Sequence, residues 1–308
     1  MTIDELNASI QDGTIDDLIM VCEARQIKAL SHIADRVSAR RDVRLLLVAG
    51  GSSAGKTTTS KRLVTQLAVN GIKSLAISTD DYFVGDKYNP RDENGQLDYE
   101  HLKCVDADKL TRDIKELLAG RPVLEHRFDF AKHEPYDTSN MLSLPAGGII
   151  VIEGIHALNP ALLPNIDDSL IHRVFVEPKG QPMVFAKTRL APRMGRLLRR
   201  MVRDNRYRKM SPIDTLNMWP KVIAGEEKWI DPFRKYADDE FDSALGYELA
   251  VLKPFAEGLL LAAEAKLPDS VEIHILKDVL QLVKTIGPAK VPGDSIIRET
   301  IGGSLLEY

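Results

Sequence analysis

The sequence predicts an α/β fold in which a parallel β-sheet is covered by helices on both faces. Short apolar runs recur along the chain at 43–49, 74–78, 148–154, 172–178 and 239–245, and helical stretches lie between them. A continuous apolar run such as VRLLLVAG is typical of a strand that is buried on both faces of a parallel sheet. The alternation of such runs with helices is typical of a doubly wound fold. The run at 239–245 is the least apolar of the five.

The sequence divides into three parts. Residues 1–41 are expected to form an N-terminal helical arm, residues 42–285 the α/β domain, and residues 286–308 a C-terminal tail packed on the core. Two stretches of the domain interrupt the alternation: a polar, turn-rich stretch at 82–136 and a strongly basic stretch at about 187–211. Extra segments on an α/β core often carry binding residues and lids. We therefore expect the first to form an inserted binding region and the second a helical lid.

Composition and charge restrict the class of protein. The 308 residues are 44% hydrophobic and 28% charged, which provides enough apolar material for a sizeable core. The net charge of -4 argues against a chain devoted to nucleic acid. Cys22 and Cys104 are too few for a disulfide framework or a metal cluster. The acidic N-terminus does not resemble a signal peptide, and no apolar run reaches the roughly 20 residues that cross a bilayer. We expect a cytoplasmic protein without a membrane partner.

A glycine-rich loop follows the first apolar run. It matches the pattern G-x-x-x-x-G-K-[ST] with Gly50, Gly51, Ser52, Ser53, Ala54, Gly55, Lys56 and Thr57. The glycines allow backbone angles that a Cβ would block, so successive N–H groups form an anion nest at the positive end of the next helix. Lys56 brings a charge to the β- and γ-phosphates, and Thr57 offers a hydroxyl to Mg²⁺. Together with Thr58, the loop predicts a site for a nucleoside triphosphate.

A phosphate loop alone does not name the reaction. A GTPase carries a D-x-x-G switch after a strand and an N-K-x-D guanine reader. The letters DENG at 92–95 match the first, but no strand precedes them, and N-K-x-D is absent from the sequence. A motor protein shows further motifs after a strand that ends in acids, whereas the only such strand here ends in a single Glu153. The sequence therefore favours a kinase over both classes.

Acidic residues follow two of the predicted strands. Glu153 ends the run GIIVIEG, at the edge of the sheet where ligands bind in open α/β folds, and its carboxylate can hold Mg²⁺. Helix capping is the alternative role. Asp80 and Asp81 follow the run SLAIS. One of these carboxylates can accept the proton of a substrate hydroxyl beside the γ-phosphate, although aspartate is also common in turns.

The basic stretch predicts a lid helix. Ten lysines and arginines lie between Lys187 and Lys209 against one acid, Asp204. Four of its arginines share one helical face because they are spaced i, i+3, i+4 and i+7, namely Arg196, Arg199, Arg200 and Arg203. Such a helix can close over a triphosphate, stabilise the charge that develops during transfer and exclude water. A solvated or nucleic-acid-binding basic face is the alternative.

The motifs together resemble a known family. SLAISTDDYF, NPRDENGQLDYEH, GRPVLEHRFDFAKHE, IIVIEGIHAL and RLLRRMVRDNRYR follow the phosphate loop in this order. This order is similar to that of the uridine kinase and phosphoribulokinase family of P-loop kinases, over roughly residues 43 to 245. Later segments, including IIRETIGGS, resemble a bacterial uridine kinase-like branch. The resemblance implies a three-layer α/β sandwich of the P-loop NTPase type, with an Arg-rich lid and an inserted acceptor-binding region.

The resemblance also implies roles for the phosphate-transfer residues. Asp80 matches the catalytic aspartate that activates the accepting hydroxyl, and Glu153 matches the acid that helps to position Mg²⁺. Arg200, Arg203 and Arg208 match lid arginines that contact phosphates. With Lys56, the expected catalytic residues are therefore Asp80, Arg200 and Arg203, while Arg208 joins the ATP site and Thr57 and Glu153 form the metal site.

The acceptor site is matched less closely. His133 corresponds to the histidine that contacts the pyrimidine base in uridine kinases, and Glu100 lies where an aspartate binds the ribose hydroxyls. Phe128 stands in the place of a tyrosine whose hydroxyl helps to read the base. Tyr82, Asp80 and Arg203 complete the expected acceptor site. Because lost hydrogen-bonding groups weaken discrimination for a polar ligand, the resemblance supports the transfer chemistry more strongly than it supports one acceptor.

The sequence thus predicts an ATP-dependent small-molecule kinase that transfers the γ-phosphate to a hydroxyl, most readily that of uridine or cytidine. GTP is an alternative donor. Alternative acceptors are a sugar phosphate, a pantothenate-like alcohol or a hydroxy-amino acid. A nucleotide-binding regulator without turnover is the alternative from another class, and the intact Lys56, Thr57, Asp80 and Glu153 argue against it. Self-association into a homo-oligomer is compatible with each of these functions.

Overall fold

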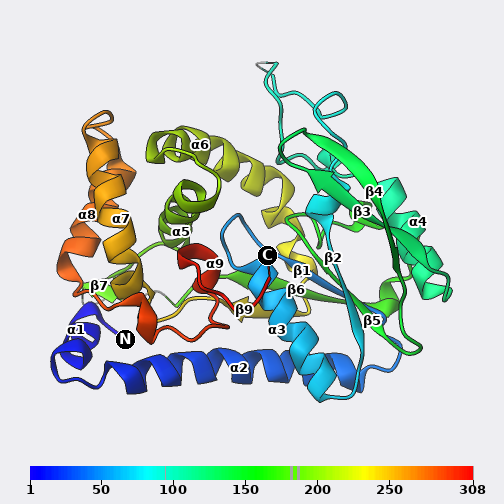
Figure 1. The fold of residues 1–308 in the computed structure, drawn as a ribbon, viewed down its shortest axis with the longest axis horizontal. Coiled ribbons are helices and arrows are strands. Elements are labelled where there is room, and N and C mark those ends of the chain that lie inside the picture. Colours follow the sequence, from blue (N-terminus) through cyan, green and yellow to red (C-terminus); the bar gives the residue numbers. More distant parts are fainter. Residues whose placement is uncertain (94, 181–182, 186–187, 308) are drawn as a thin grey trace.

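The computed structural model describes residues 1–93, 95–180, 183–185 and 188–307. Its centre is a five-stranded parallel sheet in the order β2–β5–β1–β6–β9 (Figure 1). The strands of this sheet are β1 Leu45–Ala49, β2 Ser74–Ser78, β5 Ile149–Glu153, β6 Ile171–Glu177 and β9 Asp239–Asp242. Each coincides with one of the apolar runs, and the strand before the glycine-rich loop is the middle one. The predicted α/β fold with a parallel sheet is confirmed.

Helices cover both faces of this sheet. The helices of the described residues are α1 Ile3–Gln11, α2 Ile15–Ala39, α3 Lys56–Val69, α4 Ala107–Leu118, α5 Pro192–Tyr207, α6 Pro212–Trp229, α7 Glu248–Glu264, α8 Val271–Leu282 and α9 Arg298–Ile301, of which α2 and α3 cover one face and α4 the other. Along β1 the side chains alternate between two hydrophobic cores: Leu46 and Val48 join the core that contains α2 and α3, whereas Leu45 and Leu47 join the core that contains α4. The result is a three-layer sandwich whose central strands are buried on both faces.

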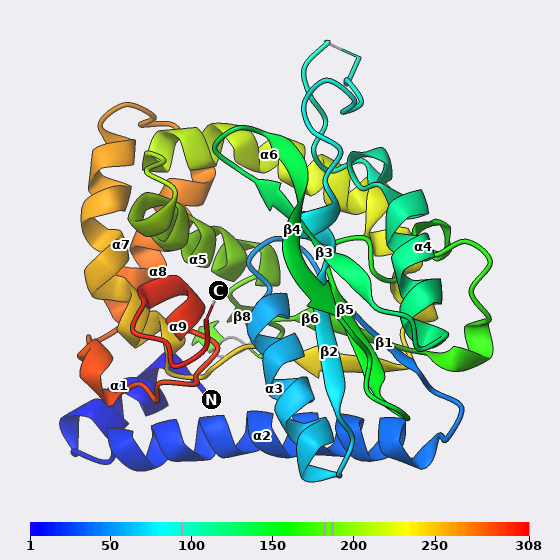
Figure 2. The same ribbon diagram turned by 45° about the vertical axis from the view of Figure 1, so that its right-hand side comes forward.

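Two antiparallel hairpins lie outside the main sheet. The larger consists of β3 Val123–Asp129 and β4 Glu134–Leu142, and the smaller of β7 Met183–Phe185 and β8 Thr188–Arg189. The larger hairpin curves along one side of the molecule, in front of β2 and β5 in the view of Figure 2. The hairpin and α4 fall largely in the stretch that the sequence marks only as polar and turn-rich. The sequence does not predict β4, because most of its side chains are exposed and it lacks an apolar run.

The N-terminal residues are part of the main core. Arg62 of α3 donates one hydrogen bond to Gln26 (2.9 Å) and another to Glu23 (3.1 Å), both on α2, and all three side chains are buried. Tyr247, at the start of α7, donates to the other oxygen of Glu23 (2.6 Å). Residues 1–41 are helical, and α2 packs into the main core on one face of the sheet.

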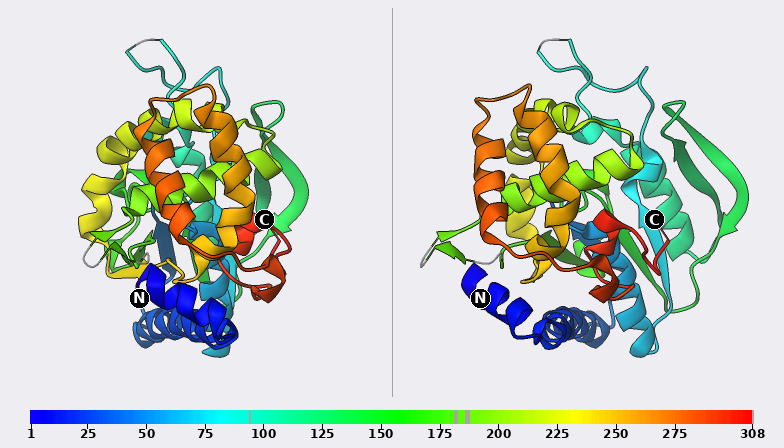
Figure 3. Two further views of the ribbon diagram at one scale, coloured as in Figure 1. Left: turned by 90° about the vertical axis from the view of Figure 1, so that its left-hand side faces the viewer. Right: turned by 60° about the vertical axis from the view of Figure 1, so that its left-hand side comes forward.

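The remaining helices form a layer beside the sheet. α5 packs against α6, α7 and α9, and α7 pairs with α8. The α7–α8 pair and the β3–β4 hairpin lie on opposite sides of the molecule in the right-hand view of Figure 3, and α2 runs along the bottom of the view in Figure 1. Ile296, Ile297 and Ile301 from the C-terminal residues are buried in the same core as α2. Within the part of the chain that the structure describes, no helix is long and apolar enough to span a bilayer.

Candidate active site

The glycine-rich loop joins β1 to α3 and has the backbone of an anion site. Gly55 has a φ of 89° and Ser53 a φ of 58°, both in the left-handed region. α3 begins at Lys56, and its N-terminus has no side-chain cap, so the first-turn N–H groups and the positive end of the helix dipole remain for an anion. The Ser53 hydroxyl is buried without a hydrogen-bond partner. These features fit a bound phosphate chain.

Lys56 and Arg200 lie over this loop. The ammonium of Lys56 donates to the carbonyl oxygen of Gly51 (3.2 Å). The guanidinium of Arg200 donates to the hydroxyl of Ser52 (2.7 Å), and this arginine is buried. Burial lowers the pKa of Arg200, and the neighbouring Asp204 opposes that shift. Two of the predicted catalytic cations are therefore held beside the loop that is expected to carry the triphosphate.

The carboxyl edge of the sheet brings the predicted metal residues together. Glu153 ends β5 and lies opposite Ser78 of β2 and Val48 of β1 in the strand register. One carboxylate oxygen of Glu153 accepts from the Ser78 hydroxyl (2.8 Å) and from the Thr57 hydroxyl (3.4 Å). Magnesium in nucleotide sites is commonly held by one or two protein oxygens, with phosphates and water completing the shell. Thr57 and Glu153 have the chemistry of such a pair.

Glu153 is buried next to another acid. Its burial, together with the charge of Asp80, raises the pKa of the Glu153 carboxyl, while Lys56 and the bond from Ser78 oppose the shift. Two acids this close to each other and to a lysine are suited to a cation or to proton transfer. Asp80 itself is exposed and lies in the turn Thr79–Tyr82, where its backbone N–H donates to the Ser78 hydroxyl (3.3 Å).

The neighbouring aspartate has a different environment. Asp81 pairs with Arg127 of β3 (3.2 Å), and Arg127 also pairs with Glu125 (2.6 Å). Burial raises the pKa of Asp81 and Arg127 lowers it. A cavity of about 180 Å³ lies between α3, the end of β2 and the hairpin, with Thr57, Asp81, Arg127 and Glu153 among its lining residues. Asp81 thus ties the hairpin to the carboxyl edge of the sheet.

The arginine face of α5 is mostly used inside the protein. Arg196 forms a buried two-point ion pair with Glu226 of α6 (2.7 and 2.8 Å). Arg199 is buried against Glu248 of α7. Both pairs join α5 to neighbouring helices, so these two arginines hold the helix in place. The periodicity correctly places them on one face, but the expectation that the whole face meets phosphates is too broad.

The other lid arginines surround a buried acid. Asp204 is fully buried, and its carboxylate lies 2.9 Å from Arg203, 3.2 Å from Arg200 and 3.5 Å from Arg208. The pKa of Arg208 is lowered by burial and by Arg203, and Asp80 raises it again, so Arg208 lies near the predicted catalytic aspartate. The described part of the lid is already packed against the phosphate loop. Lys187, at its predicted start, falls outside the described residues.

Glu100 approaches the phosphate side from the acceptor region. A Cβ at Gly225 of α6 would lie 2.3 Å from the Glu100 Cβ, so the two backbones are in close contact there. Burial raises the pKa of Glu100 to about 7, while the charges of Arg200 and Lys56 lower it. This carboxyl group is therefore close enough to the two cations of the phosphate site to be influenced by their charges.

The hairpin carries an aromatic cluster beside this acid. The Phe128 ring meets Phe83 edge-on at 5.6 Å and Phe130 at 5.1 Å between centroids. His133 is at the hairpin turn with a φ of 56°, and its Nδ1 lies 3.3 Å from Asp86. Phe128 and His133 are thus on one hairpin, but they point to different partners. The expected base-reading pair is not joined by direct contact.

Two predicted binding residues are used differently. Tyr82 is 1% exposed and donates its hydroxyl to Asp113 of α4 (3.1 Å), and it also lines the cavity beside Asp81. The Thr58 side chain is fully buried and donates to Glu299 of α9 (2.8 Å). Only the backbone N–H of Thr58 faces the uncapped end of the helix. In both cases the side-chain hydroxyl donates its hydrogen bond to a residue from another segment of the chain, Asp113 for Tyr82 and Glu299 for Thr58.

Sequence reasoning missed three residues of the site. Ser78 and Arg127 hold Glu153 and Asp81, and Asp204 organises three arginines. Ser78 could have been found as the last residue of a strand that ends beside the phosphate loop. The signal for Asp204 was its position as the lone acid in a basic helix, because a buried charge needs opposite charges around it. No local signal marks Arg127.

Comparison with known proteins gives a consistent family. The model of the phosphoribulokinase / uridine kinase family matches residues 45–189. The uridine kinase of Staphylococcus aureus (strain JH9) is 28% identical over 192 residues, which cover 62% of this chain and 83% of that protein.

Two solved structures overlap with the fold. The structure of a possible uridine kinase from Bacillus stearothermophilus is 20% identical, covers 65% of this chain and 89% of that one, and has a TM-score of 0.41. D-glycerate 3-kinase from Cryptococcus neoformans var. grubii is 11% identical, covers 89% of this chain and 87% of that one, and has a TM-score of 0.31. The family-model match over residues 45–189 and the similarity to curated uridine kinases support the phosphoribulokinase / uridine kinase family of kinases for this chain.

Proposed function

We propose that the protein transfers the γ-phosphate of ATP to a hydroxyl group of a nucleoside, with uridine and cytidine as the first candidates. The observation that carries this proposal is the meeting of Thr57 and Glu153 at the carboxyl edge of the sheet, with Asp80 close enough to influence the pKa of Glu153. A metal-binding pair, a free carboxylate and a phosphate loop in one place are the parts that phosphoryl transfer needs.

Each residue of the candidate site has a defined role in this proposal. The loop N–H groups and Lys56 bind the β- and γ-phosphates, and Thr57 and Glu153 hold Mg²⁺. Bound Mg²⁺ supplies neutralisation of phosphate charge. Asp80 orients the accepting hydroxyl and takes its proton. Arg200, Arg203 and Arg208 stabilise the charge that spreads over the transferred group, and the packed α5 limits access of water.

The acceptor side supports an uncharged, partly planar acceptor. The Phe83–Phe128–Phe130 cluster offers ring edges and faces to a flat group. Arg127 is neutralised by Asp81 and Glu125, so it is not set aside for a second phosphate. Glu100 adds a carboxyl that can accept hydrogen bonds from a polyol. These features favour a nucleoside over a sugar phosphate.

The test is a transfer assay with purified protein. Mg·ATP and, separately, Mg·GTP are incubated with uridine, cytidine, other nucleosides, sugar phosphates, pantothenate and hydroxy-amino acids, and product is followed by mass. We expect a phosphorylated nucleoside, and we expect Lys56→Ala and Asp80→Asn to lower kcat/KM by about 10²–10⁴. Glu134→Gln, on the exposed face of β4, is the matched control and should retain activity.

The assay also decides between the alternatives. A phosphorylated sugar phosphate or hydroxy-amino acid in place of a nucleoside would contradict the proposed acceptor but keep the transfer chemistry. Binding of Mg·ATP without any phosphorylated product would favour the nucleotide-binding regulator. Retention of full turnover by Asp80→Asn would show that Asp80 is not the base.

A further inference from the structure

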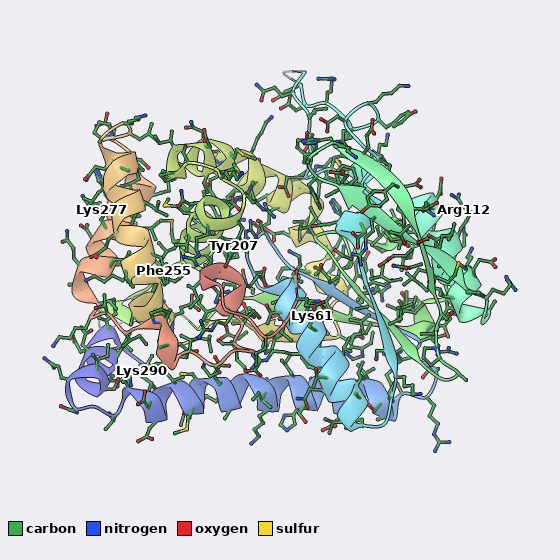
Figure 4. The ribbon with its side chains drawn as sticks, viewed as in Figure 1. Lys61, Arg112, Tyr207, Phe255, Lys277 and Lys290 are labelled. Carbon is green, nitrogen blue, oxygen red and sulfur yellow. The ribbon has the colours of Figure 1, made fainter. Side chains whose placement is uncertain are left out.

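The C-terminal residues cover the phosphate loop. The segment 291–301 includes α9 and lies against α5, and in two views it is drawn beside α3 (Figures 1 and 2). Its buried side chains are Val291, Ser295, Ile296, Ile297, Thr300 and Ile301. Figure 4 shows Tyr207, the last residue of α5, next to α9. A Cβ at Gly302 would lie 2.3 Å from the Tyr207 hydroxyl, so the end of α9 is in close contact with the lid helix.

This segment reaches the glycine that precedes the catalytic lysine. A Cβ at Gly55 would lie 2.5 Å from the terminal methyl group of Ile296. Because Gly55 also has a left-handed φ of 89°, both its conformation and its neighbour require glycine. Ile296 therefore packs on the backbone that turns from the loop into α3, and the loop has little freedom to move toward the C-terminal segment.

A hydrogen bond connects the same segment to the first turn of α3. The Thr58 hydroxyl donates to Oε2 of Glu299 (2.8 Å). Thr58 is fully buried and follows Thr57, the predicted metal-binding hydroxyl. Glu299 is partly exposed, and its charge is close enough to Glu153 to influence the pKa of that carboxyl. The C-terminal carboxylate is thus next to the nucleotide site, although it belongs to a segment about 240 residues away.

We propose that Glu299 is a positioning residue of the nucleotide site: through the Thr58 hydroxyl it fixes the first turn of α3, so that the N–H groups and Thr57 point at the phosphates. The proposal rests on the proposed kinase function, since it assigns Glu299 to the same phosphate site. Ile296 acts with it by holding Gly55. A charged acceptor suits this role, because hydrogen bonds to carboxylates are stronger than neutral ones.

The test measures nucleotide binding directly, without an acceptor. Binding of Mg²⁺ with the β,γ-imido analogue of ATP is followed by calorimetry for wild type, Glu299→Ala, Glu299→Gln, Thr58→Val and the double variant Glu299→Ala/Thr58→Val. We expect Glu299→Ala and Thr58→Val each to raise Kd about tenfold, since each removes one charge-assisted hydrogen bond. The double variant should be no weaker than either single variant, because both remove the same bond.

Two further measurements test the proposal: the nucleotide affinity of Glu299→Gln and the KM values of Glu299→Ala in the transfer assay. Glu299→Gln keeps an oxygen acceptor and should recover most of the affinity. In the transfer assay Glu299→Ala should raise the KM for ATP and leave the acceptor KM unchanged, which a general loss of folding would not do. Glu307→Ala, an exposed acid of the same terminal segment, is the matched control and should bind as wild type does. Thermal melting checks that each variant is folded.

The outcomes separate this proposal from the proposed function. If wild type binds the analogue and Glu299→Ala binds it equally well, or if the two single effects multiply in the double variant, the positioning role is wrong and the kinase proposal stands. If Glu299→Ala does not fold, Thr58→Val must weaken binding about tenfold while Glu299→Gln does not, or the role is rejected. If wild type binds no nucleotide, both proposals fall.

Discussion

The phosphate side and the acceptor side of the candidate site are built in different ways. On the phosphate side, Arg196, Arg200 and Asp204 are buried; Arg196 pairs with Glu226 of α6, and Arg200 pairs with Asp204 within α5. On the acceptor side, Phe130 is 60% exposed and His133 is at an exposed turn. The α5 side chains beside the phosphate loop are thus fixed by the core of the protein, whereas the side chains predicted to meet the acceptor are on a hairpin with one solvent-facing strand. Substitutions on the exposed strand of such a hairpin cost little free energy of unfolding.

This contrast predicts that the largest loss of stability comes from the phosphate side. Asp204→Asn removes the buried charge that three arginines share, and leaves the buried Arg200 and the partly buried Arg203 without this counter-ion, whereas Arg208 is exposed. Breaking a buried ion pair in this way costs about 3–5 kcal/mol. We expect the free energy of unfolding, measured by urea denaturation, to fall by about that amount.

Asp278→Asn on α8 is the control for this change, because Asp278 is exposed and its replacement should stay within about 0.5 kcal/mol of wild type. Equal stability of the two variants would mean that the arginine cluster does not hold the lid, and the contrast between the two sides would lose its main support.

A smaller effect is expected where the two sides meet. The pKa of Glu100 is raised to about 7 by burial, so between roughly pH 4.5 and 7 the folded protein keeps a proton that the unfolded chain releases. Stability due to this group is therefore lost as the pH rises through that range. Glu100→Gln should be more stable than wild type by about 2 kcal/mol at pH 8 and equally stable at pH 4.

Thermal melting of both proteins across pH 4–8 measures this difference. Glu134→Gln, which replaces an exposed acid, should give a pH profile parallel to that of wild type. A parallel profile for Glu100→Gln as well would place Glu100 in solvent and remove it from the boundary between the two sides.

The smallest change in free energy is expected from the hairpin, and it should appear in substrate binding. Phe128→Ala removes one of the three rings of the aromatic cluster, which is worth about 1 kcal/mol and corresponds to a roughly fivefold to tenfold higher acceptor KM. The KM for ATP should not change, since the ring does not belong to the phosphate site. Steady-state kinetics with each substrate varied in turn measures both constants.

Leu124→Ala on the same strand is the matched control, because Leu124 is 44% exposed and lies outside the cluster. If Phe128→Ala raised the KM for ATP as much as that for the acceptor, the hairpin would belong to the nucleotide site, and the division into two sides would need to be redrawn.

The difference between the two sides also explains what the sequence could predict. The strands of the main sheet and the phosphate loop were predictable because buried parallel strands are continuously apolar and because the loop pattern is set by backbone geometry. Glu153 and Asp80 could be proposed as site residues because they lie at or just after the ends of predicted strands. The hairpin was not predictable, since most of β4 is exposed and polar.

Other features depended on partners far away in the sequence. The burial of Tyr82 depends on Asp113, and the occupation of the Thr58 hydroxyl depends on Glu299. The integration of residues 1–41 depends on Arg62 reaching Glu23. Local patterns describe a residue's own element, but they do not report which distant side chain meets it in the folded protein. These were the places where the predicted roles had to be changed.

The cover over the phosphate loop has a consequence for how the protein is made. Thr58 and Glu299 are separated by 241 positions, so at about 5–20 residues per second a ribosome adds the second of them roughly 10–50 seconds after the first. During that interval the growing chain carries a glycine-rich loop whose covering segment does not yet exist. Under the role proposed for Glu299, ordered nucleotide binding would therefore be one of the last properties that the newly made protein acquires.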